Sequence, residues 1–186
     1  MSNLITKVKT PIFRVVFPHV FTPQANLQGK LKYSITMLFP NSTNLDELKT
    51  AAQNAAVNKW GQKIPASLRS PFRMGEEKKD KYPCFAGCVF INATSNQKPG
   101  VVDGNVMPIM DQSEFYSGCY AIATLNAFAY SQAGNMGVSF GLNNLQKIKD
   151  GEPLAGTSRP EDDFKSINPE QAASPAESKQ LAPSLF

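Results

Sequence analysis

Positive and aromatic side chains are interspersed in one stretch of the sequence, residues 65–83, which reads PASLRSPFRMGEEKKDKYP. Lysine and arginine can contact phosphates, and exposed rings can stack on bases, so this mixture is typical of surfaces that hold a single-stranded nucleic acid. The stretch has three prolines and no hydrophobic periodicity, which predicts a long loop. Loops of this length are uncommon in compact domains unless they have a function or are disordered.

Further basic and aromatic residues extend this candidate surface beyond the loop. An ordinary solvated loop would explain Lys78 and Lys79 equally well, and Lys30 and Lys32 also fit the solvent-facing side of an antiparallel strand. The residues expected to contact phosphates are Lys7, Lys9, Arg14, Lys30, Lys32, Arg69, Arg73, Lys78, Lys79, Lys81, Lys147 and Lys149. Those expected to stack on bases are Phe72, Tyr82, Tyr116 and Tyr120.

The patterns that enzymes need are missing, so we expect no catalytic residue. The only histidine, His19, lies among aromatic residues and prolines, which does not favour a catalytic triad. The glycines of GNMGVSFG are not followed by the GK[ST] ending of a phosphate-binding loop. Asp103, Asp111 and Glu114 are near one another, but no lysine follows them in the manner of a metal-dependent nuclease.

The three cysteines predict no metal site. Cys84 and Cys88 are four positions apart, Cys119 is distant, and one histidine is too few to complete a zinc site. We expect reduced, packed thiols, with no metal and no cofactor.

Charge is distributed unevenly along the chain. Residues 1–150 hold 16 Lys/Arg and 9 Asp/Glu, a net charge of +7, whereas residues 151–186 hold 3 and 6, a net charge of −3. A basic body favours an anionic partner, and an acidic tail could compete for the same surface. The tail is rich in Pro, Ala and Ser without an apolar period, which predicts disorder.

Most of the body is predicted to be β-structure. In the segment 30–39, polar side chains at 30, 32, 34 and 36 alternate with apolar ones at 31, 33, 35, 37 and 39, which is typical of a half-buried strand. One helix is expected over residues 44–61, with Asn44 as its cap and Gly61 at its end. The other expected strands cover 11–17, 84–95, 114–130 and 137–150, with a short edge piece at 106–111.

The long strand at 114–130 has two unlike faces. One carries Tyr116, Tyr120, Phe128 and Tyr130, and the other is almost entirely small residues. We expect Phe128 and Tyr130 in the core, and Tyr116 and Tyr120 exposed enough to meet a base. The alternative is that all four rings form the barrel core and that the helix covers the alanine-rich face.

The fold class predicted from these elements is mainly β: an OB-fold, which is a five-stranded Greek-key barrel, with one inserted helix, long loops and a disordered C-terminal tail. The expected division is a barrel domain over 1–150 and a flexible tail over 151–186. No apolar run approaches the ~18 residues of a membrane span, and no secretory signal precedes the body, so we expect a soluble protein that works in a cytoplasm.

Three segments resemble a family of bacteriophage single-stranded-DNA-binding proteins. They are FYSGCYA (115–121), MGVSFGLNNLQKIKDGEPLAG (136–156) and LRSPFRMGEEK (68–78), and the resemblance covers most of residues 1–156. It implies an OB-fold broadly similar to the single-strand binder of the short-tailed coliphages. It also implies a basic, aromatic-lined groove that protects single-stranded DNA during phage replication and recombination in the infected bacterium, without catalysis.

The same resemblance concerns the tail and the partners. The coliphage proteins end in an acidic segment with a terminal phenylalanine that contacts replication proteins and competes with DNA. Phe186 matches that ending, whereas Asp162, Asp163 and Phe164 lie well upstream of it. The expected partners are single-stranded DNA, duplex DNA more weakly, and replication proteins through these four tail residues. The alternative function is a phage structural or scaffold-type β protein with a basic protein-binding face.

Overall fold

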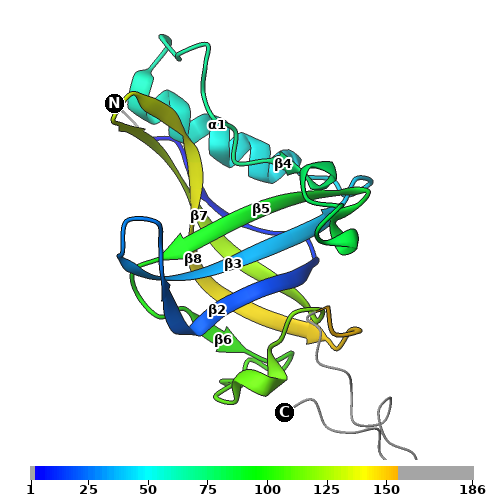
Figure 1. Ribbon diagram of the computed structural model, residues 1–186. Coiled ribbons are helices and arrows are strands. Elements are labelled where there is room, and N and C mark those ends of the chain that lie inside the picture. The colour runs from blue at the N-terminus through cyan, green and yellow to red at the C-terminus, as the bar shows by residue number, and fades with distance from the viewer. Residues whose placement is uncertain (1–2, 155–186) are drawn as a thin grey trace, which may run out of the picture. The chain divides into compact units, whose positions relative to one another are not determined.

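Five long strands close into a barrel in the computed structural model, which describes residues 3–154 (Figure 1). Around the barrel each strand pairs with the next in the order β2-β3-β5-β8-β7 and back to β2. Of the five pairings around the barrel, only that between β5 and β8 is parallel. The predicted five-stranded barrel is therefore observed. Its strands are β2 (Phe13–Ala25), β3 (Leu31–Pro40), β5 (Cys88–Ser95), β7 (Tyr120–Gln132) and β8 (Asn135–Lys149).

Short elements decorate the barrel. Strand β1 (Lys7–Lys9) pairs with β7, β4 (Arg73–Met74) with β5, and β6 (Gly100–Val102) with β8. The edge piece expected at 106–111 is reduced to one bridge between Val102 and Pro108. The 3₁₀ turns are η1 (Gly75–Glu77), η2 (Pro83–Phe85) and η3 (Gln112–Glu114).

The single helix of the described residues, α1 (Asp46–Trp60), follows β3 as the sequence predicts. The Asn44 side chain accepts a hydrogen bond from the Asp46 N–H at 2.8 Å, so it satisfies one donor of the first turn although Leu45 holds the cap position. Gly61 ends the helix with φ of 61°. No helix of residues 3–154 is both long and apolar enough to cross a membrane.

The small residues of β7 face the core, which contradicts one expectation. Ala121, Ala123, Leu125 and Ala127 are buried, and the buried alanines of α1 belong to the same core cluster. Phe128 is 45% exposed, so its expected core position is wrong. Tyr130 is half-buried and lies on the same outward face as Phe128.

The physical reason for this orientation is the space that other residues leave. Large rings from other segments, Phe13, Phe39, Phe115 and Phe140, already fill the interior. Strand β7 can approach α1 closely only with small inward side chains. Because successive side chains of a strand point to opposite faces, the aromatic rings of β7 then face outward. Of the alternative arrangement, the helix does cover the alanine-rich face, but the four-ring face does not form the barrel core.

A second apolar cluster lies outside the barrel. Residues 73–87, here called the strap, fold over the outward side of β2, β3 and β5 and bury Val16, Leu38, Phe85 and Phe90. Within the strap, the backbone at Gly75 lies so close to the backbone at Phe85 that a Cβ on Gly75 would be 1.9 Å from the Phe85 carbonyl oxygen. Glycine at this position is therefore required for the strap to close.

We predict that Gly75→Ala lowers the free energy of unfolding by about 1–3 kcal/mol, because the added methyl must displace backbone. The matched control is Gly104→Ala, where a Cβ would meet nothing within 4 Å; its effect should stay within about 0.5 kcal/mol. Urea unfolding of the three proteins measures both. Equal stability of all three would show that the strap is not packed as described.

Candidate nucleic-acid interface

The outward side of β3 and β5 carries a row of polar residues, called the front face here, in which Asn92 is exposed and Thr36 is buried. Ser34 lies opposite Thr94, and Thr36 lies opposite Asn92 with its hydroxyl donating to Asn92 Oδ1 at 2.7 Å. Lys32 continues the row toward the start of β3. Figure 1 shows β2, β3 and β5 side by side on the near side of the barrel.

This surface lies where OB-folds hold oligonucleotides. Binding in that fold uses the second and third barrel strands and the loops that join strands one to two and four to five. Here those elements are β3 and β5, the turn at 26–30 and the turn at 133–134. The front face therefore has the right place in the fold for a nucleic-acid contact.

Two lysines border the front face at the β2–β3 turn. Lys30 is exposed at the tip, and Lys32 is half-buried on β3. The turn is ordered by Asn26, whose Oδ1 accepts from the Gln28 N–H at 3.0 Å and from the Lys30 N–H at 2.9 Å. The cations are thus held by a defined turn rather than by a free loop.

The strap adds rings and cations at the other end of the front face. Phe17, Tyr82, Phe85 and Phe90 form a series with centroid separations of 5.2, 5.8 and 5.2 Å. Phe85 and Phe90 are fully buried, whereas Phe17 and Tyr82 are half-buried at the rim. The two rim rings are the part of this series that a base could reach.

Cations lie over these rings. The Lys78 ammonium is 4.8 Å from the Phe90 centroid, and the Lys81 ammonium is 5.4 Å from that of Tyr82. The Arg73 guanidinium is 5.1 Å from the Phe90 centroid. Such contacts are attractive, and they concentrate positive charge on the outside of the strap.

Two ion pairs partly neutralise that charge. Arg73 pairs with Glu77 at 2.6 Å and Lys79 with Glu76 at 2.7 Å. The hydrogen bond from Lys79, the N–H of Gly87 and the charge of Lys79 all lower the pKa of Glu76. Exposed pairs of this kind contribute little to stability, so phosphates could replace the carboxylates at small cost.

Phe17 is a residue that sequence reasoning missed. It has φ of 47°, which is rare for a bulky side chain, and it sits in a register shift between Val16 and His19. Its N–H donates to Ser117 Oγ at 2.9 Å. The segment FPH gives no signal for this conformation, so only the structure reveals that its ring borders the front face.

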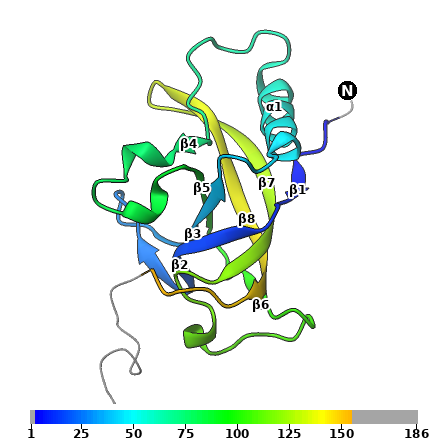
Figure 2. The same cartoon turned by 90° about the vertical axis from the view of Figure 1, so that its right-hand side faces the viewer.

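Other expected contact residues lie elsewhere. Phe72 packs edge-on against Phe140 at 6.0 Å and covers the core, so it is not a free ring. Arg69 exchanges backbone hydrogen bonds with the start of β8. Lys7 and Lys9 are exposed on β1. Figure 2 shows the strap and β1 on opposite sides of the barrel.

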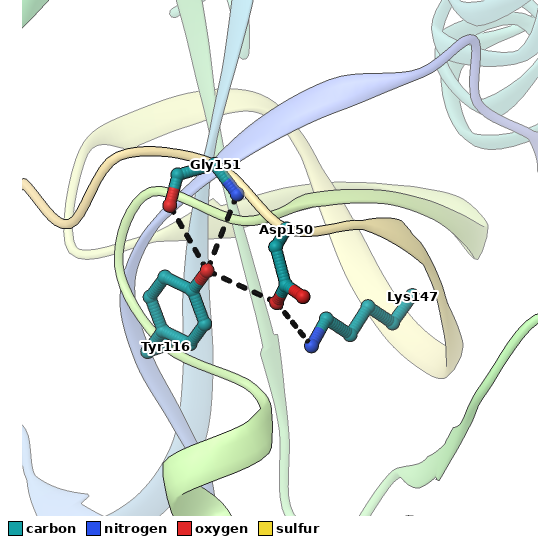
Figure 3. Close-up of polar contacts among 4 residues, drawn as sticks. All are labelled: Tyr116, Lys147, Asp150 and Gly151. Atoms are coloured by element: carbon teal, nitrogen blue, oxygen red, sulfur yellow. Dashed lines mark hydrogen bonds and ion pairs between the residues drawn. The ribbon is translucent and has the colours of Figure 1, made fainter.

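The Tyr116 side chain anchors the end of β8 (Figure 3). Its hydroxyl lies 3.0 Å from Asp150 Oδ1 and 2.9 Å from the Gly151 carbonyl, and it accepts from the Gly151 N–H at 3.2 Å. Burial is the main cause that raises the pKa of Tyr116. The half-buried ring packs against the core, so Tyr116 is engaged within the protein, and its contact with a base stays a prediction.

Lys147 belongs to the same network. Its ammonium lies 2.7 Å from Asp150 Oδ1 and 5.5 Å from the Tyr116 centroid. Burial alone would lower the pKa of Lys147, but the bond and charge of Asp150 outweigh it, and the pKa is raised. This lysine stays charged and is engaged within the protein.

Arg14, Tyr120 and Lys149 gather at the junction of β2, β7 and β8. The Tyr120 centroid is 4.7 Å from the Lys149 ammonium and 5.8 Å from the Arg14 guanidinium. Arg14 also donates to the Glu152 carbonyl at 2.8 Å and to the Gly118 carbonyl at 3.3 Å. Residues 151–154 therefore pack on the barrel, and Leu154 joins the second cluster.

Among residues 3–154 no three His, Cys, Asp or Glu side chains are grouped so that they could hold a metal ion. Burial raises the pKa of all three cysteine thiols. The tail residues expected to contact proteins, Asp162, Asp163, Phe164 and Phe186, lie outside the described residues.

Comparison with known proteins decides the family. The family model described as "Enterobacter phage Enc34, ssDNA-binding protein" matches residues 6–174. The chain belongs to this family. A relative, protein p50 of Acyrthosiphon pisum secondary endosymbiont phage 1, is 33% identical over 163 residues, which cover 81% of this chain and 87% of the relative.

Solved structures of phage proteins share this fold. The single-stranded DNA-binding protein of bacteriophage Enc34 in complex with ssDNA has a TM-score of 0.69 at 22% identity, over 81% of this chain and 90% of that one. The single-stranded DNA-binding protein gp2.5 of bacteriophage T7 has a TM-score of 0.57 at 13% identity, over 82% and 97%. The predicted OB-fold and the resemblance to phage single-strand binders are confirmed, and the Enc34 family is one of binding proteins rather than enzymes.

We predict that Tyr116→Phe lowers the free energy of unfolding by about 1 kcal/mol, because the Gly151 N–H, the Gly151 carbonyl and the Asp150 carboxylate each lose a hydrogen bond. The control is Tyr33→Phe on β3, whose hydroxyl forms no hydrogen bond within residues 3–154; its effect should be within about 0.5 kcal/mol.

The same pair of variants gives a pH test. Since folding raises the pKa of Tyr116, its proton stabilises the folded state below the ordinary phenol pKa of about 10, and this stabilisation is lost as pH rises through the folded value. The stability difference between wild type and Tyr116→Phe should therefore shrink in alkaline buffer. A difference that grows with pH would contradict the buried, neutral phenol.

Proposed function

We propose that this protein binds single-stranded DNA across the front face, without sequence preference, and protects it during phage DNA replication and recombination in the cytoplasm of the infected host. The observation that supports this most is one surface on the second and third barrel strands that is polar and bordered by cations at both ends. Membership in the Enc34 ssDNA-binding family supports the same ligand.

Phosphates would be contacted from both ends of the front face. Lys30 and Lys32 serve one end, and Lys78 and Lys81 serve the other; none of these four is in an ion pair within residues 3–154. Arg73 and Lys79 would join them when phosphates replace Glu77 and Glu76. Each phosphate contact releases counterions, so affinity should fall as salt rises.

Bases would meet the rim rings and the strand surface between the cations. Phe17 and Tyr82 offer π-faces, which stack on any base. Ser34 and Thr94 offer short hydroxyl groups, and Asn92 Oδ1, which a bidentate contact with adenine would use, already accepts from the Thr36 hydroxyl. The surface therefore suits stacking and backbone contact rather than sequence recognition.

Two further partners follow from the sequence. We propose that duplex DNA binds more weakly, since any phosphate chain is attracted to these cations, and that the tail residues contact replication proteins. A scaffold-type β protein remains the competing function, and it would bind no oligonucleotide.

The test is fluorescence anisotropy of labelled oligo-dT at several salt concentrations, with a duplex competitor. We predict that Lys30→Ala/Lys32→Ala weakens binding and reduces the slope of log K against log salt by about 0.7 for each phosphate that the variant no longer neutralises. The control is Lys49→Ala/Lys63→Ala, which removes the same charge from α1 and the residues that follow it.

Equal weakening by both double variants would mean that only the general field matters, which contradicts a contact at the front face. An absence of binding by the wild-type protein at low salt would support the scaffold function instead.

A further inference from the structure

The outward side of the β7–β8 hairpin carries a ring that the barrel core and the front face do not use. Phe128 is 45% exposed and lies opposite Ser139 in the strand register. Gly141 is its other neighbour: a Cβ there would lie 4.0 Å from the Phe128 ring. Small neighbours thus leave the side of this ring open.

Lysines flank the same surface. On β1, Lys7 lies opposite Asn126 and Lys9 opposite Thr124, so both project to the outward side of the sheet, where they are exposed. Neither lysine is in an ion pair within residues 3–154. The segment 115–149 contains no aspartate or glutamate. No acidic residue of the hairpin itself therefore offsets these lysines.

At the start of β7, the other end of this surface, an aromatic ring again lies close to positively charged side chains. The Tyr120 ring lies between Lys149, at 4.7 Å, and Arg14, at 5.8 Å. Between Tyr120 and Phe128 the outward positions of β7 carry Ile122, Thr124 and Asn126, and Asn126 donates to Asn143 Oδ1 at 3.2 Å. At ~3.4 Å per residue the two rings are roughly 27 Å apart along β7, a distance that spans several nucleotides.

Arg14 of β2 links the outward surface of the hairpin, called the rear face here, to the strands of the front face. We define the rear face by the outward residues Lys7, Lys9, Tyr120, Asn126, Phe128, Asn143 and Lys149. Arg14 of β2 pairs in register with Leu38 of β3 on one side and with Tyr120 of β7 on the other. Leu38 itself is buried beneath the strap, so Arg14 and the strap lie between the front face and the rear face.

We infer that the rear face is a second binding surface for single-stranded DNA. A strand that leaves the front face crosses the barrel at Arg14 and Tyr120 and follows β7 to Phe128, where a base stacks. Asp46 and Glu47 of α1 line a hollow beside Lys7 and Lys9, so their negative charge confines the strand to the hairpin. The inference rests on the proposed function, because it extends the same bound strand.

A second binding surface makes the affinity for single-stranded DNA depend on the length of the strand. An oligonucleotide that only fills the front face gains nothing from the rear face, whereas a longer one gains both cations and a stacking ring. Loss of the rear face should therefore weaken only the binding of longer strands.

The experiment compares oligo-dT of about 8 and about 20 nucleotides, within and beyond the ~4–16 nucleotides that one OB-fold covers. Wild-type protein, Lys7→Ala/Lys9→Ala, Phe128→Ala and the Lys49→Ala/Lys63→Ala control are titrated by anisotropy, with melting temperatures measured in parallel. We expect each rear-face variant to lose about five- to tenfold in affinity for the longer strand and to keep its affinity for the shorter one within about twofold. The control should change neither.

Unchanged binding of the longer strand by both rear-face variants would overturn the inference and leave the proposed function intact. Equal loss at both lengths, or an equal loss in the control, would also overturn it, because the effect would then be general. A change of sedimentation coefficient in Phe128→Ala without a change in DNA affinity would overturn it too, and would assign the ring to contact with a second copy of the chain. If the wild-type protein binds neither length, the proposed function fails and the inference fails with it.

Discussion

Small side chains on the inner side of β7 determine which side chains of this strand face outward. Ala121, Ala123 and Ala127 let α1 and the barrel pack against β7 at short range. Since a strand alternates with a period of two, this packing places Tyr120 and Phe128 on the outward side. A slip of one residue would bury the rings and expose the alanines, so the same constraint fixes both the core and the surface.

The strap links stability to binding in a similar way. Phe85 and Phe90 are fully buried beneath it and stabilise its position, while Phe17 and Tyr82 of the same ring series remain accessible at the rim. Cations over these rings are held by aromatic contacts rather than by carboxylates alone. A segment with the composition of a mobile loop is therefore folded, with its charge directed outward.

Much of this arrangement could be predicted from the sequence, because it depends on local signals. The alternation in residues 30–39, the helix between Asn44 and Gly61 and the proline-rich segment 65–83 all follow from periodicity and turn chemistry. The parallel β5–β8 pairing that closes the barrel joins distant segments and leaves no local signal.

The site itself is harder to predict, because burial decides which rings are free. The choice between the two faces of β7 depends on how much space the rings from other strands leave. The bonds of Tyr116 to Asp150 and Gly151, and the backbone of Phe17 at φ of 47°, are products of the tertiary fold. The sequence identifies the basic residues as a set, but only the structure divides them between the front face, the rear face and internal contacts.

Lysine acetylation with and without oligo-dT, read by mass spectrometry, tests the central claim most directly, because it maps the bound strand on the intact protein. The front face as binding surface predicts that Lys30, Lys32, Lys78 and Lys81 become protected, whereas Lys49 and Lys63 react as before. Unchanged reactivity of the first four lysines in a saturated complex would contradict it.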